Sequence, residues 1–189
     1  MLSNLITDRT AVDVSYLLQQ VQKWQNGTMT DEEKTEFLAG LKGAYNAVDL
    51  NRVEGAVKFI NDHMNGFQAA FDTLRASLGV ANDSFWLIPF APLSFETKTD
   101  WAMSDTPAET DLDGRYLRNV DKLTDQFPIE KSLPASVANN LTFEGANAIE
   151  RALLAVYEAA KKYETETKQL IENTAAGWAQ SGEIYGGEF

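Results

Sequence analysis

Cysteine is absent from the chain, and histidine occurs only once, at position 63. Without cysteine the chain cannot form disulfides or use a thiolate as a nucleophile or metal ligand. A single histidine cannot build a metal site from several imidazoles, and it leaves no spare for a Ser-His-Asp relay. We therefore predict that His63 is an exposed helical side chain rather than a catalytic one.

Basic residues are the minority charge, with 16 Lys and Arg against 28 Asp and Glu, which gives a net charge of −12. The basic residues also form no cluster along the chain. Because an acidic chain repels the phosphate backbone, we expect no nucleic-acid partner.

Long apolar runs are missing as well. No stretch approaches the ~18 apolar residues of a membrane-spanning helix, and the run 85–90 is interrupted by Pro89. The N-terminus has no basic start followed by an apolar core, so no signal peptide is visible. We expect synthesis in the cytoplasm, no membrane insertion, and exit from the cell only by lysis or within a larger particle.

The composition that remains is that of a folded protein, with 44% apolar residues in a chain of 189. Residues 10–25 carry apolar side chains at the spacing of one helix face, between an N-cap at Thr10 and a stop at Asn26-Gly27. Residues 30–33 form a capping box that opens a second helix, which Lys42-Gly43 closes.

The strongest pattern is a heptad seam that starts after Asp49. Steps of four and three residues predict one rod of about 45 Å that ends at Gly79. Gly55 and Gly66 each weaken this rod by roughly 1 kcal/mol, so it needs packing partners. The seam consists of Val53, Val57, Ile60, Met64, Phe67, Phe71, Leu74 and Leu78.

A second long helix is predicted over 142–176, with a weaker seam that contains Ala160 and Thr167. The seam residues are Ile149, Leu153, Val156, Ala160, Tyr163, Thr167 and Leu170. Residues 177–189, rich in glycine and aromatic residues, are predicted to be an extended arm. The arm is expected either to order on a partner or to fold back on its own helices.

All five prolines lie between the two rods, in residues 80–141. We interpret this segment as an irregular connector with strand-like stretches in 85–98, especially 93–98. A short helix follows, with one apolar side made of Leu112, Tyr116, Leu117, Val120, Leu123 and Phe127. The predicted fold is therefore mainly α, divided into 1–79, 80–141, 142–176 and 177–189.

The two predicted rods begin with the same motif, Asn-x-(Val/Ile)-Glu-x-Ala, at residues 51–56 and 147–152. In both, Asn and Glu favour a helix start while the branched residue enters the seam. Six positions leave both chance and a true duplication open.

Motifs for chemistry are scarce. Asp111-Leu112-Asp113-Gly114 resembles part of a calcium loop, but the frame places Glu109 and Val120 where Asp and Glu are required. Acidic pairs occur at 32–33, 111/113 and 164/166, and they are typical of solvated helix faces. No phosphate loop, nucleophile elbow or HExxH is present. We predict no catalytic residue, no cofactor and no metal.

Self-association, or at least association with a partner, is expected because eight apolar seam positions exceed what the weaker second rod can cover. Among the tryptophans, core packing is predicted for Trp24 and Trp86, and an interface for Trp178. The full set of predicted interface residues is Val53, Val57, Ile60, Met64, Phe67, Phe71, Trp178, Ile184, Tyr185 and Phe189.

Several strings spread over most of the chain together resemble one known group of proteins. They are Asp8-Arg9-Thr10, Met29-Thr30-x-Glu32-Glu33, the stretch 41–54 around Asn51-Arg52-Val53-Glu54, Trp101 with Asp105-Thr106-Pro107, Arg115-Tyr116-Leu117-x-Asn119-Val120, Leu133-Pro134, Ala146-Asn147-Ala148-Ile149-Glu150, and the stretch 181–188. The chain resembles tail-fibre or baseplate-associated structural proteins of phages and prophages of Gram-positive bacteria. The motif residues are Asn51, Arg52, Glu54, Trp101, Arg115, Tyr116, Asn119, Asn147 and Glu150.

The resemblance implies a component of a virion or phage-tail-like particle that is made in the bacterial cytoplasm. Its implied partners are other tail or baseplate proteins, with a role in host attachment. Two other functions stay open. One is a module that binds glycans or the cell surface through exposed aromatics, and the other is a small hydrolase using acidic residues.

Overall fold

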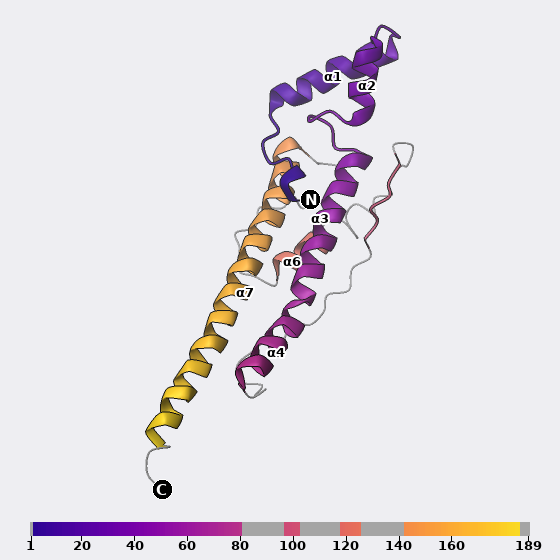
Figure 1. Cartoon of the computed structure of the whole chain (residues 1–189). Helices are drawn as coiled ribbons and strands as arrows, with labels where there is room; N and C mark the ends of the chain where they lie inside the picture. The colour runs from indigo at the N-terminus through magenta and orange to yellow at the C-terminus, as the bar shows by residue number, and fades with distance from the viewer. Residues whose placement is uncertain (1, 81–96, 103–117, 126–141, 186–189) are drawn as a thin grey trace. The chain divides into compact units, whose positions relative to one another are not determined.

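The computed structural model describes residues 2–80, 97–102, 118–125 and 142–185. Within these ranges the regular elements are helices and no residue lies in a strand, which confirms the mainly α prediction (Figure 1). The elements are η1 (Leu2–Asn4), α1 (Ala11–Gln25), α2 (Asp31–Ala39), α3 (Ala47–Asn65), α4 (Phe67–Leu78), α6 (Arg118–Thr124) and α7 (Phe143–Tyr185).

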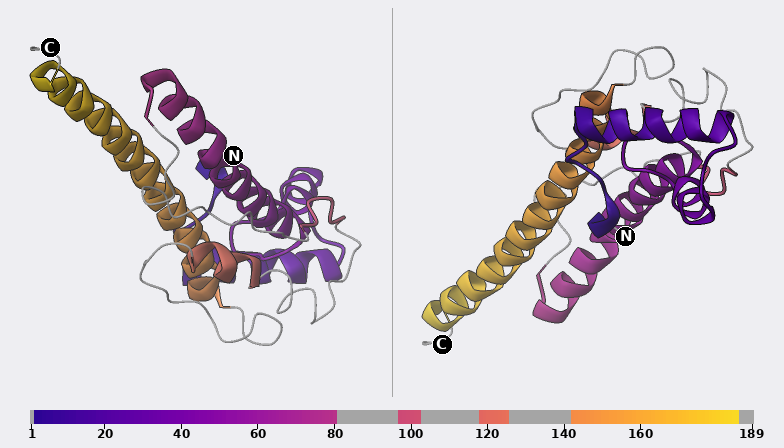
Figure 2. Two further views of the ribbon diagram at one scale, coloured as in Figure 1. Left: turned by 90° about the horizontal axis from the view of Figure 1, so that it is seen from below. Right: turned by 90° about the horizontal axis from the view of Figure 1, so that it is seen from above.

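Local capping signals place α1 and α2 as predicted. Thr10 and Asp13 form a capping box at the start of α1, and Thr30 and Glu33 form another at α2. Helix α2 ends at Ala39 rather than at Lys42-Gly43, because Gly40 adopts a φ of 98° that a helix cannot continue. The two helices contact each other and are not parallel (Figure 2). The expected core residue Trp24 stacks on Phe37 but stays half exposed.

The first predicted rod is two helices, α3 and α4, with a break at Gly66. The Gly66 amide donates to the carbonyl of His63, three residues back, at 3.2 Å. That tighter turn interrupts the regular bonding between residues four apart. Gly79 ends α4 in the left-handed conformation, with a φ of 69°, as its position predicts.

Helix α7 is longer than predicted, and this corrects the extended arm. Residues 177–185, including Ile184 and Tyr185, continue the helix, while Phe189 lies outside the described residues. A formed helix propagates at one hydrogen bond per added residue. The cost of Gly177, roughly 1 kcal/mol, is too small to stop it.

Much of the predicted connector lies outside the described residues, including Phe85–Glu96, the segment from Leu112 to Leu117, and Phe127. Thr97 and Lys98 are described and belong to no strand. Val120 and Leu123 lie on α6 and are fully buried, in line with the apolar helix side predicted there.

The chain divides into two compact units, and both α3 and α7 contribute residues to each. The first unit spans residues 1–60 and 94–156, and the second spans 61–93 and 157–189. The first unit buries Val53, Ala56, Val57, Ile60, Val120, Leu123, Ile149, Leu153 and Val156. In the second, Phe67 and Phe71 lie 5.8 Å apart by ring centroids, and Tyr163 is within 6.2 Å of both.

These cores revise the predicted interface. Six of the eight predicted seam residues, Val53, Val57, Ile60, Met64, Phe67 and Phe71, are at most 3% exposed in the single chain, whereas Leu74 is half-buried and Leu78 is 41% exposed. Periodicity indicates that a face is buried without specifying what covers it, and here the chain itself covers these residues. Self-association therefore needs a different surface.

Candidate functional site

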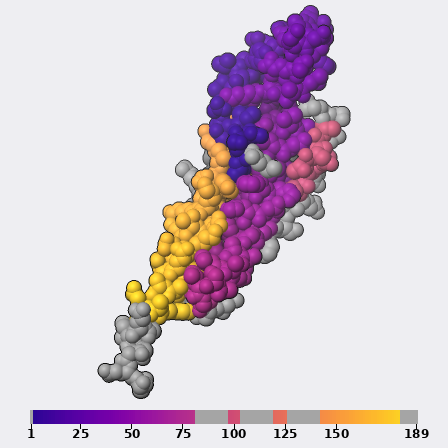
Figure 3. Space-filling view, in the orientation of Figure 1, coloured from indigo at the N-terminus to yellow at the C-terminus, as the bar shows by residue number. Residues whose placement is uncertain are grey.

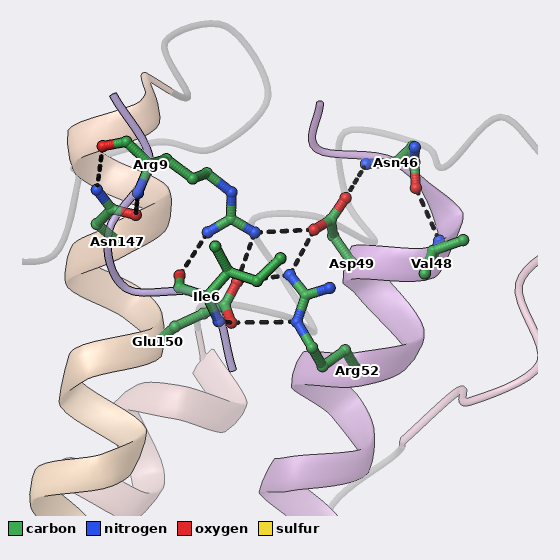
Figure 4. A network of polar contacts seen from close by, with 8 residues as sticks. All are labelled: Ile6, Arg9, Asn46, Val48, Asp49, Arg52, Asn147 and Glu150. Carbon is green, nitrogen blue, oxygen red and sulfur yellow. Dashed lines mark hydrogen bonds and ion pairs between the residues drawn. The ribbon is translucent and has the colours of Figure 1, made fainter. Parts of the chain in front are cut away.

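Three segments of the first unit meet at a buried polar cluster: the stretch 5–10, the first turns of α3, and the first turns of α7. On the surface, the N-terminal segment (indigo) lies against the start of α7 (orange) and against α3 (purple) (Figure 3). The Asn46 side chain accepts from the Val48 amide at 2.9 Å, and Asp49 accepts from the Asn46 amide at 2.9 Å. Thr142 caps α7 by accepting from the Gly145 amide at 3.2 Å. These caps fix the starts of the two helices, and with them the side chains that meet in Figure 4.

Arg9 is the centre of this cluster. Its Nη2 lies 2.8 Å from Asp49 Oδ1 and 2.8 Å from Glu150 Oε1, and its Nη1 donates to the Ile6 carbonyl at 2.6 Å. The guanidinium also lies 5.4 Å from the centroid of the Tyr45 ring. One side chain thus joins its own segment to both α3 and α7.

Arg52 completes the cluster from α3. Its guanidinium donates to both oxygens of Glu150, at 2.7 and 3.1 Å, and also to Asp49. The second oxygen of Glu150 accepts from the Ile6 amide as well, at 2.5 Å. We call Arg9, Asp49, Arg52 and Glu150 the charge network. It holds two cations and two anions, and its net charge is zero.

Burial and neighbouring charges set the protonation states of Arg52 and Tyr45. Burial alone lowers the pKa of Arg52, but the hydrogen bonds and charges of Glu150 and Asp49 outweigh it and raise the pKa above its ordinary value. Burial, with the nearby Glu150 and Asp49 carboxylates, raises the pKa of Tyr45 well above its usual range. Arg52 therefore stays charged and Tyr45 stays neutral at any physiological pH.

Two asparagines clamp the backbone beside the network. Asn147 accepts from the Arg9 amide at 3.0 Å and donates to the Arg9 carbonyl at 2.9 Å. Asn51 accepts from the Trp101 amide at 2.7 Å and donates to the Trp101 carbonyl at 2.8 Å. Each side chain satisfies both polar groups of one residue, which holds a non-helical segment against a helix.

A third buried carboxylate, Glu54, lies one turn further along α3. It is 1% exposed, and Asn119 of α6 donates to its oxygens at 3.2 and 3.4 Å. This contact ties α6 to α3, as the network ties α7 to α3.

Seven of the nine motif residues come together here: Asn51, Arg52, Glu54, Trp101, Asn119, Asn147 and Glu150. Arg115 and Tyr116 lie outside the described residues. Sequence reasoning missed Arg9 and Asp49 as site residues, although both stand in the quoted strings. A polar residue in a short segment between helices is ordinarily solvated, so spacing alone does not show that Arg9 is buried.

His63 belongs to the second unit, and its predicted exposure is wrong. Its side chain is half-buried against Phe67, in edge-on contact, and against Tyr157. Its Nε2 lies 3.3 Å from Glu164 Oε2, and Lys168 binds the other carboxylate oxygen, Oε1, at 2.6 Å.

The contacts of the charge network hold three segments of the chain together. Both oxygens of Glu150 already accept from arginine, and the second also accepts from a backbone amide. Among the described residues, no group of three or more metal-ligating side chains occurs, and no helix could cross a membrane. The acidic pair 111/113 falls outside these residues. Comparison with protein-family models, curated proteins and solved structures found no match to the chain.

Proposed function

We propose that the protein is a non-enzymatic structural component of a phage tail or phage-tail-like particle, an adaptor at the baseplate or tail fibre that takes part in host attachment. One observation carries the proposal. The motif residues behind the resemblance to tail proteins meet in the clamps and the charge network, where they hold segments together.

A structural role fits the way these groups are used. Glu150, Asp49 and Arg9 are almost fully buried, and their charges face one another rather than an open surface. Such a cluster adds specificity of arrangement more than net stability. A part that must dock in one orientation within a large assembly benefits from that specificity.

The surface offered to partners lies on α1 and α2. Large apolar side chains stand exposed there, and the most exposed is Val12, at 76%, with Leu18 and Leu38 above half. Covering such side chains with a partner removes apolar surface from water, which favours association. The proposed partners are other tail or baseplate proteins and further copies of the chain, with no nucleic acid and no membrane insertion.

A second function, binding of cell-wall glycans, is favoured by one pair of rings. Trp24 stacks on Phe37 with centroids 5.6 Å apart, and 48% of Trp24 remains exposed. A rigidly backed and exposed indole is the kind of platform on which a sugar ring packs.

The test is to purify tail particles from a bacterium that carries the gene and to count copies of the protein per particle by quantitative mass spectrometry. We expect a fixed whole-number copy per particle, retained after washing in high salt. Absence from washed particles refutes the structural function. Binding of the isolated protein to cell walls, lost in Trp24→Ala and kept in Trp178→Ala, would then favour the glycan function.

A further inference from the structure

The two asparagine clamps occupy equivalent positions in their helices and make equivalent contacts. Asn51 and Asn147 stand at the same place in their helices, five residues after the capping side chains of Asn46 and Thr142. Each binds the amide and the carbonyl of a single residue in a non-helical segment. The first turns of α3 and α7 therefore resemble each other both in sequence and in the contacts that they make.

The equivalence continues along both helices at a constant offset of 96 residues. Glu54 and Glu150 are at most 1% exposed, and so are the core pairs Val53/Ile149, Val57/Leu153 and Ile60/Val156. Further on, Met64/Ala160, Phe71/Thr167 and Arg75/Ile171 are all buried as well. A shared heptad phase explains buried positions, but it does not explain a clamp and a buried glutamate at matching sites.

The clamped segments also match each other. Arg9 is the last residue of Thr7-Asp8-Arg9, and Trp101 is the last of Thr99-Asp100-Trp101. In both, the aspartate is exposed while the backbone of the next residue is held by an asparagine. Each copy therefore contains a Thr-Asp-x segment followed by a long helix that carries the clamp.

The pairing is crossed. The segment of the first copy, at Arg9, is held by Asn147 of the second, and the segment of the second, at Trp101, is held by Asn51 of the first. We propose that the chain is a fused dimer, two consecutive copies of one helical unit in which each copy clamps the Thr-Asp-x segment of the other. Reciprocal contacts of this kind are the mark of a two-fold symmetric interface, in which the same surface is used on both sides.

The copies differ at the charge network. The positions equivalent to Arg9, Arg52 and Asp49 are Trp101, Ala148 and Gly145, so these three charged side chains occur at only one of the two clamps. The network therefore distinguishes the two ends. It fits the segment with arginine to α7, because an uncharged segment there would leave Glu150 and Asp49 with one cation instead of two.

The partner assigned to each copy is thus the other copy, and neither is complete alone. The contacts between the two copies are the same whether or not the protein belongs to a tail particle. It can be tested on the full chain, into which a protease recognition sequence is inserted between residues 81 and 96. After cleavage, native mass spectrometry at micromolar concentration reports whether the two halves stay together.

We expect one particle of about the original mass, 21.0 kDa plus the insert. Asn51→Ala and Asn147→Ala should each weaken the association of the halves by about 10- to 100-fold, since each removes two hydrogen bonds, which are buried at Asn147 and part-buried at Asn51. Asn65→Ala and Asn173→Ala are the matched controls, exposed on the same two helices, and should change nothing. Halves that separate and each remain helical would overturn the proposal.

A second measurement covers variants that fold poorly after cleavage. In the uncut chain, amide hydrogen exchange at Trp101 should rise about tenfold or more in Asn51→Ser, and exchange at Arg9 should rise likewise in Asn147→Ser, each without the other. Unchanged exchange at either clamped amide, or an effect of one asparagine only, contradicts a reciprocal dimer.

Discussion

Replacing Arg9 with methionine tests the charge network most directly. The Arg9 side chain is 1% exposed and binds Asp49, Glu150 and the Ile6 carbonyl. Methionine keeps most of the apolar volume, so the main change is the loss of one buried cation. Arg52 then faces two buried carboxylates alone, and the cluster carries a net charge of −1.

Breaking a buried ion pair by removing one partner costs about 3–5 kcal/mol. Against a total stability of about 5–15 kcal/mol, Arg9→Met should lose a large share of the free energy of unfolding. Urea denaturation at pH 7, followed by circular dichroism, measures it. Arg151→Met is the matched control because Arg151 is exposed on α7, and it should stay within about 0.5 kcal/mol of the parent.

The double variant Arg9→Met/Glu150→Met separates charge balance from simple packing. It leaves the pair Arg52–Asp49, whose charges cancel, so its loss should be smaller than the sum of the two single losses by about 1–3 kcal/mol. Strict additivity, or an Arg9→Met loss no larger than that of Arg151→Met, would refute the network as the element that holds the three segments together.

Further outcomes are expected at four single positions. A Cβ on Gly43 would lie 2.2 Å from the Asp13 carbonyl oxygen, so Gly43→Ala should lower the free energy of unfolding by about 1–3 kcal/mol. A Cβ on Gly177 of α7 would meet nothing within 4 Å, so Gly177→Ala should raise it by up to about 1 kcal/mol. Thermal melts measure both changes. The pKa of Tyr45 is raised in the folded state, so the stability that its neutral form contributes is complete below the ordinary pKa of tyrosine and is lost as pH rises above it. An absorbance titration should show one tyrosine that ionises at higher pH than the others. Tyr45→Phe should remove that late-ionising tyrosine. Phe67→Asp buries an unpaired charge in the second unit and should lower the melting temperature far more than Leu170→Asp at an exposed position; equal melting temperatures would reject the assignment of Phe67 to the core.

Local signals in the sequence predicted the local parts of this fold. Both capping boxes are correct because their partners stand three residues apart. The seam around Val57 and Phe71 is buried as its period indicates, but the covering surface came from the chain itself. Helix breaks were harder to predict, because one glycine changes the free energy of a helix by only about 1 kcal/mol. Gly66 interrupts the first rod, whereas Gly177 does not end α7.

The site was predictable only in part. Asn51, Arg52, Asn147 and Glu150 were singled out by the motif strings, but nothing in their spacing indicates that they meet. Arg9 bonds to Asp49 and Glu150, which lie 40 and 141 residues away along the chain. Contacts over such separations are set by how the helices pack, and a single sequence contains no direct signal of them.

The neutrality of the charge network has a colloidal consequence. Its four side chains cancel, so the whole excess of 12 negative charges is carried by the rest of the protein. Two molecules that approach each other therefore repel until ions screen them, over a distance of about 8 Å at physiological ionic strength. Any assembly of identical chains through the apolar residues of α1 and α2 should strengthen as salt is added, opposite to the behaviour of a contact made by surface ion pairs.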